Sequence, residues 1–461
     1  MTEAIEAWLR GVYGGRRWLL GVDVAQGGRA LAAKVLAFGA KGAFVVSGQE
    51  GTGDPAADAG VPERTLGLPE MPMMAAIRAA EAALRALPPD VQAAIDAWDP
   101  DRRAMALGAI FSDGRDIGGR RFFGARPLAW QALEDKTTID TIWDAVGVPR
   151  APSVVVPVAE ARAAAAKLDQ GHGTVWAADL SRGFHGGAAS TWWVRDDPGA
   201  AEAFFANEAE RVRVMPFLDG IPCSIHGIVL PDHVVVLLPN EMVVLRRPGG
   251  NGFTYARAAN FWLPSEAFGA ELRATARTVG ETLRGMLRYR GAFTIDGVAT
   301  ADGFRPTELN PRVGAALGQM VPGLAFDLWN AALVAGEPFP LPGERIEAEF
   351  LAIAEAKRGG SLMFLFDRKL TASSTHPLVW AGDRWRAAEA GETPHTVATA
   401  GPGPSGGVVM APLKREFTPV GPSVAPRAVA LAAWADEALG AGIGPLEAAP
   451  DLRAVPTDRL A

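Results

Sequence analysis

The order of hydrophobic and polar positions predicts strands that alternate with helices near the start of the chain. Residues 18–22 and 42–46 are short apolar runs, and residues 30–38 between them have the spacing of a helix. A strand, a helix and a second strand in this order favour a parallel sheet. A loop rich in Gly, Pro and Asp follows, and residues 104–111 then have the pattern of another strand. We therefore expect a first α/β domain over residues 1–127.

The same alternation continues through the middle of the chain, residues 128–340. The clearest helix there covers residues 266–288, and Ser265 in front of it suits a helix N-cap. One face of this helix carries apolar residues at intervals of four and three, namely Leu272, Ala276, Val279, Leu283 and Met286. We expect this middle segment to form a central domain.

The last part of the chain, residues 341–461, has the pattern of a smaller closing domain. Residues 349–356 and 407–413 have the pattern of strands, with loops rich in Gly and Pro between them. An Ala-rich helix is predicted over residues 427–439. The fold class that follows from the whole pattern is α/β.

Composition and charge narrow the classes of function. The 461 residues are about three times the ~150-residue prior for one domain, and 49% apolar with 21% charged residues is typical of a globular chain. Apolar runs stay below the ~18 residues that a membrane helix needs, and Glu3 and Glu6 argue against a signal segment. We expect a cytoplasmic protein with no membrane partner. The net charge of −7 disfavours nucleic acid as a partner, and the single cysteine, Cys223, excludes an internal disulfide.

Residues 291–312 predict a hairpin that carries two acids. Strand-like alternation on both sides of a turn at Asp302 puts Asp296 opposite Glu308, and Thr294 opposite Asn310. Pro306 has no N–H group, so the second strand must be an edge strand or contain a bulge.

Directly opposed carboxylates repel each other unless a cation lies between them. Magnesium prefers hard oxygen ligands, and the side chains of Asp296, Glu308 and Asn310 supply them. A solvated hairpin with incidental acids accounts for the spacing equally well, so the residues alone leave both interpretations open.

The segment from Asp296 to Glu-Leu-Asn-Pro-Arg at residues 308–312 resembles the metal-binding hairpin of the ATP-grasp superfamily, including its biotin carboxylase and purine-pathway members. This resemblance implies that Asp296, Glu308 and Asn310 hold Mg²⁺ on ATP, with Mn²⁺ as an alternative. It also implies that Arg312 orients an acyl phosphate or its acceptor. The implied architecture is a Rossmann-like N-terminal domain, a two-lobed ATP-grasp core and a small C-terminal domain.

The segment Glu134-Asp135-Lys136 is similar to the opening of the nucleotide site in that family, which gives Lys136 a phosphate contact. The glycine-rich flap of the family corresponds to residues 182–187, where the resemblance assigns cofactor contacts to Arg182, Gly186 and Gly187. A second phosphate-binding lysine of the family has no counterpart near Ala177. Arg182, Arg246 and Arg247 stay open as its replacement.

The hinge strand that contacts adenine in the family corresponds to residues 212–220. Met215, Phe217 and Leu218 are the cofactor contacts that it implies, although the sequence favours a packing role for Phe217 over stacking on the base. Arg246, which precedes a Gly-rich loop, suits a phosphate or a carboxylate, and a solvated arginine pair beside the loop is equally consistent with the sequence. We assign it a catalytic role beside Arg312.

The activity implied is that of an ATP-dependent carboxylate-amine ligase, which forms an acyl phosphate and releases ADP and phosphate. Its expected partners are a small carboxylate and an amine, and a homodimer stays open. A small-molecule kinase and a non-catalytic ATP-binding scaffold are the alternatives. A biotin-dependent carboxylase is less favoured because the sequence has no biotin-carrier segment with a Met-Lys pair.

Overall fold

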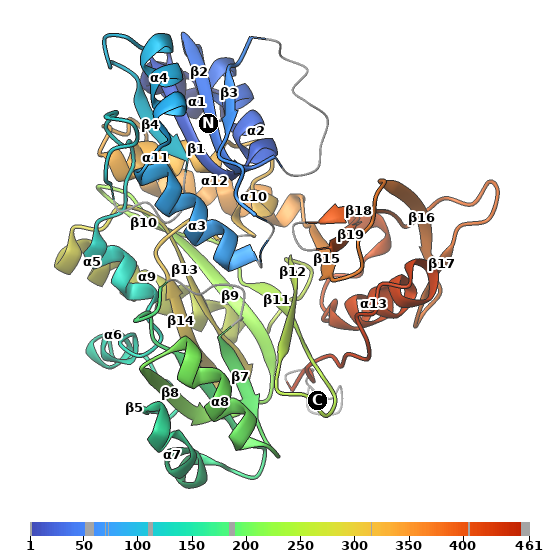
Figure 1. Ribbon diagram of the computed structural model, residues 1–461. Helices are drawn as coiled ribbons and strands as arrows, with labels where there is room; N and C mark the ends of the chain where they lie inside the picture. Colours follow the sequence, from blue (N-terminus) through green and yellow to red (C-terminus); the bar gives the residue numbers. More distant parts are fainter. Residues whose placement is uncertain are drawn as a thin grey trace.

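The computed structural model describes residues 2–50, 60–69, 71, 73–108, 114–183, 190–314, 316–403 and 406–452. The fold class predicted from the sequence is confirmed, because helices and strands mix throughout these residues (Figure 1). Among them, no helix is long and apolar enough to cross a membrane.

The N-terminal part forms a parallel sheet, as the sequence predicts. Its strands lie in the order β3-β2-β1-β4, and β1 pairs in parallel with β2 and β4. The elements are α1 (Thr2–Tyr13), β1 (Arg17–Val24), α2 (Ala25–Ala37), β2 (Gly42–Gln49), β3 (Glu63–Thr65), α3 (Met73–Arg85), α4 (Pro89–Trp98) and β4 (Met105–Gly108).

A small antiparallel sheet follows, with the strand order β5-β8-β6-β7. Short helices and turns lead into it: α5 (Leu128–Gln131), η1 (Ala132–Glu134) and α6 (Asp140–Ala145). The lobe itself consists of β5 (Val154–Pro157), η2 (Val158–Glu160), α7 (Ala161–Leu168), β6 (Thr174–Ala178), β7 (Thr191–Val194), α8 (Pro198–Glu208) and β8 (Arg211–Pro216). Trp176 and Phe205 are fully buried in the core of this lobe.

The large sheet runs through the rest of the molecule in the order β14-β13-β9-β11-β12-β15-β19-β18-β16-β17, with β10 paired to β9. Its first part contains β9 (Ile221–Val229), β10 (Val234–Val236), β11 (Asn240–Arg246), β12 (Phe253–Ala259), β13 (Gly291–Thr300) and β14 (Gly303–Asn310). Helix α9 (Glu266–Leu287) packs against this part of the sheet. Ser265 caps α9 as predicted, because its hydroxyl accepts a hydrogen bond from Phe268 N. The predicted buried face is correct except at Met286, which is 67% exposed.

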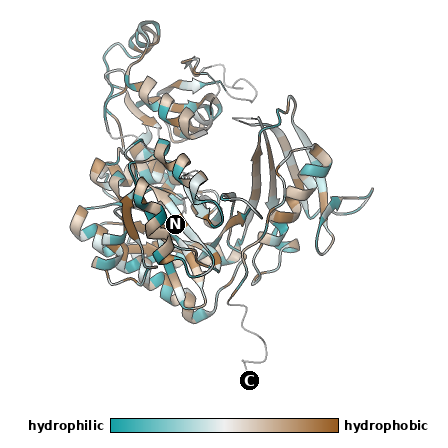
Figure 2. Ribbon diagram, turned by 60° about the horizontal axis from the view of Figure 1, so that its bottom comes forward, coloured by the Kyte–Doolittle hydropathy of each residue, from teal (hydrophilic) through white to brown (hydrophobic). Residues whose placement is uncertain are grey.

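The second part of the large sheet carries the C-terminal lobe. It contains β15 (Gly360–Phe366), β16 (Ser374–Trp380), β17 (Trp385–Ala387), β18 (Thr396–Gly403), β19 (Gly406–Leu413), η3 (Arg415–Phe417) and α13 (Ala425–Leu439). This lobe stands apart from the N-terminal domain in both views (Figures 1 and 2). One residue pair, Ala259 and Gly360, joins the ladders of β12 and β15.

One predicted strand is wrong. Residues 349–356 belong to helix α12 (Gly343–Ala356), preceded by α10 (Leu317–Met320) and α11 (Phe326–Ala335). The buried residues Ile346, Phe350 and Ala354 recur every four positions, which is the period of a helix face. The predicted strand begins at residue 349 and so excludes Ile346, which leaves too few apolar positions to show the helical period.

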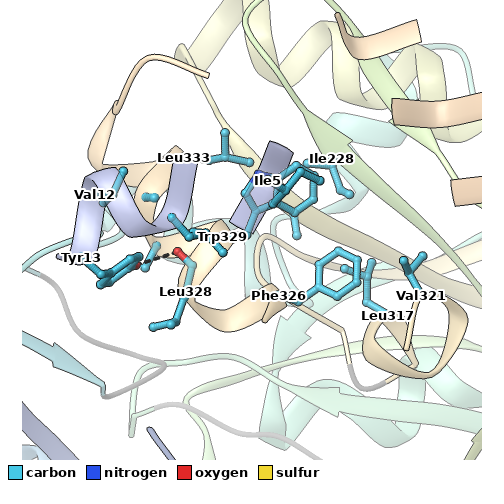
Figure 3. Close-up of a cluster of buried hydrophobic side chains, with 14 of the residues drawn as sticks. Ile5, Val12, Tyr13, Ile228, Leu317, Val321, Phe326, Leu328, Trp329 and Leu333 are labelled. Atoms are coloured by element: carbon cyan, nitrogen blue, oxygen red, sulfur yellow. Dashed lines mark hydrogen bonds between the residues drawn. The ribbon is translucent and has the colours of Figure 1, made fainter. Parts of the chain in front are cut away.

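Helices α10 to α12 share a hydrophobic core with the N-terminal domain (Figure 3). Ile5 of α1 and Trp329 of α11 are both almost fully buried in it. The Tyr13 hydroxyl donates a hydrogen bond to Leu328 O at 2.6 Å. The first helix of the chain is thus fixed to a segment that lies about 320 residues later.

Candidate active site

A cavity of about 350 Å³ lies between the small sheet and the large sheet. Strands β6, β7 and β8 contribute one side of it, and β9 and β11 to β14 contribute the other. The sequence-predicted residues that line it are Lys136, Met215, Phe217, Leu218, Arg246, Asp296, Glu308, Asn310 and Arg312. Most of the predicted site residues therefore surround one cavity.

The hairpin of β13 and β14 has the register predicted from the sequence. Asp296 pairs with Glu308, and Thr294 pairs with Asn310. The register shifts at a bulge directly after Asp296, and β14 is an edge strand of the large sheet. Both features accommodate Pro306, which has no N–H to donate to a ladder.

Asp296 is held by two neutral donors. Its Oδ1 accepts a hydrogen bond from Ser224 Oγ at 2.6 Å, and its Oδ2 accepts one from Asn310 Nδ2 at 2.8 Å. Burial, followed by the charge of Glu308 opposite, raises the pKa of Asp296 to about 7. The second of these causes is the repulsion that the opposed acids predict, and a cation between them would relieve it.

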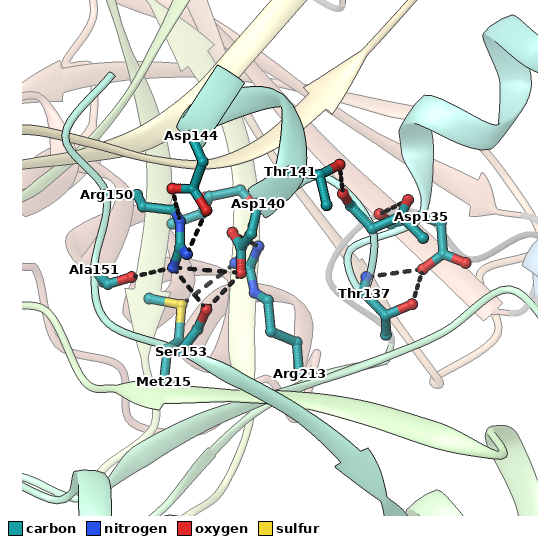
Figure 4. A network of polar contacts seen from close by, with 12 residues as sticks. Asp135, Thr137, Asp140, Thr141, Asp144, Arg150, Ala151, Ser153, Arg213 and Met215 are labelled. Atoms are coloured by element: carbon teal, nitrogen blue, oxygen red, sulfur yellow. Dashed lines mark hydrogen bonds and ion pairs between the residues drawn. The ribbon is translucent and has the colours of Figure 1, made fainter. Parts of the chain in front are cut away.

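Lys136 lies against the other acid. Its Nζ is 3.1 Å from Glu308 Oε1. Burial alone would raise the pKa of Glu308, but the charge of Lys136 and of two arginines outweighs burial and holds this pKa below its usual value. Asp135, next to Lys136, accepts hydrogen bonds from the backbone N and the hydroxyl of Thr137 (Figure 4). This contact fixes the turn that carries Lys136.

Arg312 is oriented by a buried acid from another segment. Glu134 is 4% exposed, and its Oε2 accepts a hydrogen bond from Arg312 Nε at 3.3 Å. The other oxygen of Glu134 pairs with Arg126, which also donates to Pro311 O at 3.2 Å. Arg312 Nη2 donates to Asn310 Oδ1 at 2.9 Å. The guanidinium is therefore held at the cavity wall from two sides.

Arg213 is a cavity residue that the sequence did not reveal. It lies on β8 directly opposite Ala177 of β6, at the position where the expected lysine is absent. Its guanidinium pairs with Asp140 Oδ1 at 3.1 Å and donates to Thr307 O at 3.0 Å (Figure 4). Among the described residues, its Nε has no hydrogen-bond partner. Arg213 lies beside Ala177 only because β6 pairs with β8. A sequence motif of consecutive residues cannot reveal such a neighbour.

The hinge strand ends in an aromatic stack at the mouth of the cavity. Phe217 stacks on Trp193 with ring centroids 4.0 Å apart. Arg246 lies 4.8 Å from the Phe217 ring and pairs with Asp219 at 2.7 Å. Met215 and Leu218 also line the cavity. Phe217 thus packs against a neighbour with one face while its side chain borders the cavity.

Two of the predicted arginines do not line the cavity. Arg182 is exposed and does not line the cavity, and Gly186 and Gly187 lie outside the described residues. Arg247 donates a hydrogen bond to Ile443 O at 2.7 Å and is absent from the cavity wall. Of the three arginines considered for the absent lysine, only Arg246 reaches the cavity.

The part of the cavity wall around His226 is polar but uncharged. His226 is 2% exposed, and its Nδ1 lies 2.8 Å from Thr294 Oγ1. Burial lowers the pKa of His226 to about 4, so the ring is neutral at pH 7. The side-chain oxygen of Asn240, also buried, has no hydrogen-bond partner among the described residues.

The donor set at the hairpin suits a hard divalent cation. Two carboxylates and an amide oxygen are ligand types that Mg²⁺ accepts, with phosphates and water completing its shell. In the described part of the chain, no group of three or more acidic, histidine or cysteine side chains has a metal-binding arrangement. A metal here would therefore depend on Asp296, Glu308 and Asn310 together with a ligand.

Comparison with known proteins supports the fold rather than a detailed function. No family model matches the sequence, and no curated protein matches it. The structure is similar to a biotin carboxylase–β,γ-ATP complex from Campylobacter jejuni, with a TM-score of 0.52 at 15% identity over 96% of this chain and 95% of that one. It is also similar to an L-amino acid ligase from Bacillus licheniformis, with a TM-score of 0.50 at 12% identity over 87% of this chain and 94% of that one. At such identities the likeness shows a shared fold.

Proposed function

The chain has the fold of ATP-grasp enzymes, and from this premise we propose that it is an ATP-dependent ligase that joins a carboxylate to an amine. The substrates would be small molecules, and the products would be an amide or peptide-like bond, ADP and phosphate. The observation that carries the proposal is the opposed pair Asp296 and Glu308, which lines one cavity together with Lys136 and Arg312.

The reaction would occur in two steps. A carboxylate oxygen of the first substrate attacks the γ-phosphorus of ATP, and the bond from that phosphorus to the β,γ-bridging oxygen breaks, which releases ADP. An amine nitrogen of the second substrate then attacks the carbonyl carbon of the acyl phosphate. The carbon–oxygen bond to phosphate breaks, phosphate leaves, and the nitrogen loses a proton.

The protein would contribute positioning and charge, which suffice for phosphoryl transfer without a protein nucleophile. Lys136 and Arg213 present cations to the phosphates, and Arg312 and Arg246 present guanidinium groups to the carboxylate or the acyl phosphate. Asp296, Glu308 and Asn310 would hold Mg²⁺. When bound, the metal neutralises charge on the ATP phosphates.

The adenine would lie along the hinge strand, beside Met215, Phe217 and Leu218. Met215, Phe217 and Leu218 are apolar, and the ring of Phe217 already packs on Trp193, so a flat base can pack beside them at low entropic cost. The polar wall around His226 would then face the reacting groups. We propose this orientation of ATP because the acids and cations lie between these two ends.

The experiment that tests the proposal is simultaneous measurement of ADP and phosphate release from MgATP across a panel of carboxylic acids and amines. A ligase releases the two products in equal amounts, and only when an acid and an amine are both present. ADP without phosphate would instead indicate a kinase. ATP binding without turnover under any condition would indicate a scaffold.

Replacement of Glu308 provides the matched test of the site. We expect Glu308→Ala to lower magnesium-dependent ATP turnover by about 100-fold or more, because it removes one of two carboxylate ligands. Asp302→Ala, at the exposed turn of the same hairpin, should keep wild-type turnover. Retained turnover in Glu308→Ala, with the thermal midpoint unchanged, would contradict the assignment.

A further inference from the structure

Arg257 has an unusual backbone conformation in the strand next to the cavity. Its φ is +80° in β12, and the pairing of β11 with β12 shifts between Met242 and Val244 at the same place. A side chain with a β-carbon rarely adopts this region, and residues that do so cluster at functional sites. Among the described residues, the other non-glycine examples are Arg102 and Arg288, of which Arg288 is the C-cap of α9.

The bulge inserts Arg257 between two cavity-lining residues, Tyr255 and Ala258. The guanidinium then reaches over the neighbouring strands. Arg257 Nη1 donates to Ser361 Oγ at 3.3 Å and lies 3.7 Å from Met410 Sδ. Both are weak, uncharged partners, and no carboxylate of a described residue lies within ion-pair distance of Arg257. A half-buried guanidinium with such partners keeps most of its capacity to bind an anion.

A second polar side chain converges on the same point from another element. Gln319 of α10 donates from Nε2 to Ser361 Oγ at 3.3 Å. Its side-chain oxygen is buried and has no hydrogen-bond partner among the described residues. The chain just before α10 lines the cavity at Gly314 and Ala316. Three segments of the protein therefore bring polar groups together at Ser361, beside the cavity-lining residues of β12 and of the chain before α10.

Electrostatics link this point to the cavity. Burial and the charge of Asp296 raise the pKa of the cavity-lining Tyr255 to about 12, whereas the charges of Arg257 and Arg312 lower it. The charges of both guanidinium groups are thus close enough to the Tyr255 hydroxyl, in the cavity wall, to stabilise its ionised form. Arg312 already has Glu134 and Asn310 as partners, whereas Arg257 has no acidic partner within the described parts of the chain.

We propose that Arg257, with Ser361 and Gln319, forms a subsite for a second anionic group on a substrate, either a carboxylate or a phosphate ester. The reacting carboxylate of the same or the partner substrate lies nearer Arg312. This assignment rests on the proposed ligase function for the position of the reacting group. The strained backbone at Arg257 is retained because it directs the guanidinium to the anion.

Paired ligands that differ only in charge test the subsite. Binding is measured by calorimetry in the presence of a non-hydrolysable MgATP analogue, with aspartate against asparagine, glutamate against glutamine, and phosphoserine against serine. We expect the wild-type protein to bind the anionic member of at least one pair about tenfold more tightly. The pair that shows this preference identifies carboxylate or phosphate as the group recognised.

Two variants of Arg257 separate recognition from folding. Arg257→Gly removes the guanidinium and relieves the backbone strain, so it should abolish the preference while its thermal midpoint equals or exceeds that of the wild type. Arg257→Lys should keep part of the preference. Arg102→Gly relieves the same kind of backbone strain on the exposed surface of the N-terminal domain and should leave the preference unchanged.

The proposal is overturned if the wild type distinguishes no pair, or if Arg257→Gly keeps the full preference. Ligation is measured separately, by ADP and phosphate release. A charge preference that depends on Arg257 without any ligation would contradict the proposed function and leave the subsite supported. Ligation that treats charged and neutral partners alike would contradict the subsite and leave the ligase supported.

Discussion

Position 177 illustrates how one charge in a site can come from an unexpected residue. The side chain of Ala177 is too small to reach a phosphate, but its ladder partner Arg213 fills the space beside it with a guanidinium. That guanidinium is fixed by Asp140 and by Thr307 O. A fixed, planar donor of this kind loses little freedom when it binds a phosphate oxygen.

Replacement of Arg213 should therefore impair nucleotide use more than folding. We expect Arg213→Lys to raise the KM for MgATP about tenfold, equivalent to roughly 1.4 kcal/mol, because a lysine keeps the charge but cannot keep both fixed contacts. Steady-state kinetics at several ATP concentrations measure this change.

The control for Arg213 is Arg162→Lys. Arg162 is on α7 of the same lobe and pairs with Glu202 at the surface. The KM of the Arg162→Lys variant for MgATP should equal that of the wild type. An unchanged KM in Arg213→Lys would mean that Arg213 serves only the packing of the lobe.

At the scale of elements, the hairpin was predictable because its signals are local. Alternation on either side of Asp302 sets the register, and Pro306 requires an edge or a bulge, both of which the structure contains. The bulge at Arg257 was not predictable, since it depends on how β12 pairs with β11. Helix α12 was misassigned because its apolar period begins before the window that suggested a strand.

A second element with a testable property is helix α13, whose start is held by a buried acid. Glu241 of β11 accepts hydrogen bonds from Ser423 Oγ at 2.6 Å and Val424 N at 2.8 Å. Burial nevertheless dominates and raises the pKa of Glu241 from 4.5 to about 7. Between these values the folded state holds a proton that the unfolded state has lost.

The free energy of unfolding should consequently decrease as the pH rises from about 4.5 to about 7, with a contribution from Glu241 on the order of 3 kcal/mol. Glu241→Gln should show a smaller decrease over this range, because the amide does not titrate. Thermal unfolding at each pH compares the two proteins. Glu437→Gln, exposed on the same helix, should behave like the wild type, and an equal pH dependence in Glu241→Gln would contradict this account.

At the scale of the whole molecule, the units expected from the sequence are connected more closely than a linear division suggests. The boundaries at residues 127 and 340 stay predictions. The large sheet continues from β12 into β15 across the second of them. Helices α10 to α12 share a hydrophobic core with α1. Such long-range packing leaves no local trace in the sequence, so periodicity predicts elements but not which of them pack together.

Loss of a side chain in α1 should therefore weaken the attachment of distant helices. Leu9 is fully buried in the core that α1 shares with α11, and we expect Leu9→Ala to lower the free energy of unfolding by about 2–5 kcal/mol. Denaturant unfolding followed by circular dichroism measures this change. Arg10→Ala, at an exposed position of the same helix, should change stability by less than about 0.5 kcal/mol. If the two variants changed the free energy of unfolding equally, the burial of Leu9 would not stabilise the fold, and this account of α1 would be contradicted.

The pairing of Ala177 with Arg213 also bears on how kinship between proteins is detected. Cross-strand neighbours occupy separate columns of an alignment, so a cation that has moved from one strand to the next is scored as one loss and one unrelated gain. In such an exchange the charge would keep its position in space while its position in the sequence changes. Sequence searches that score each alignment column separately do not detect such an exchange. Superposition of the three-dimensional structures does detect it.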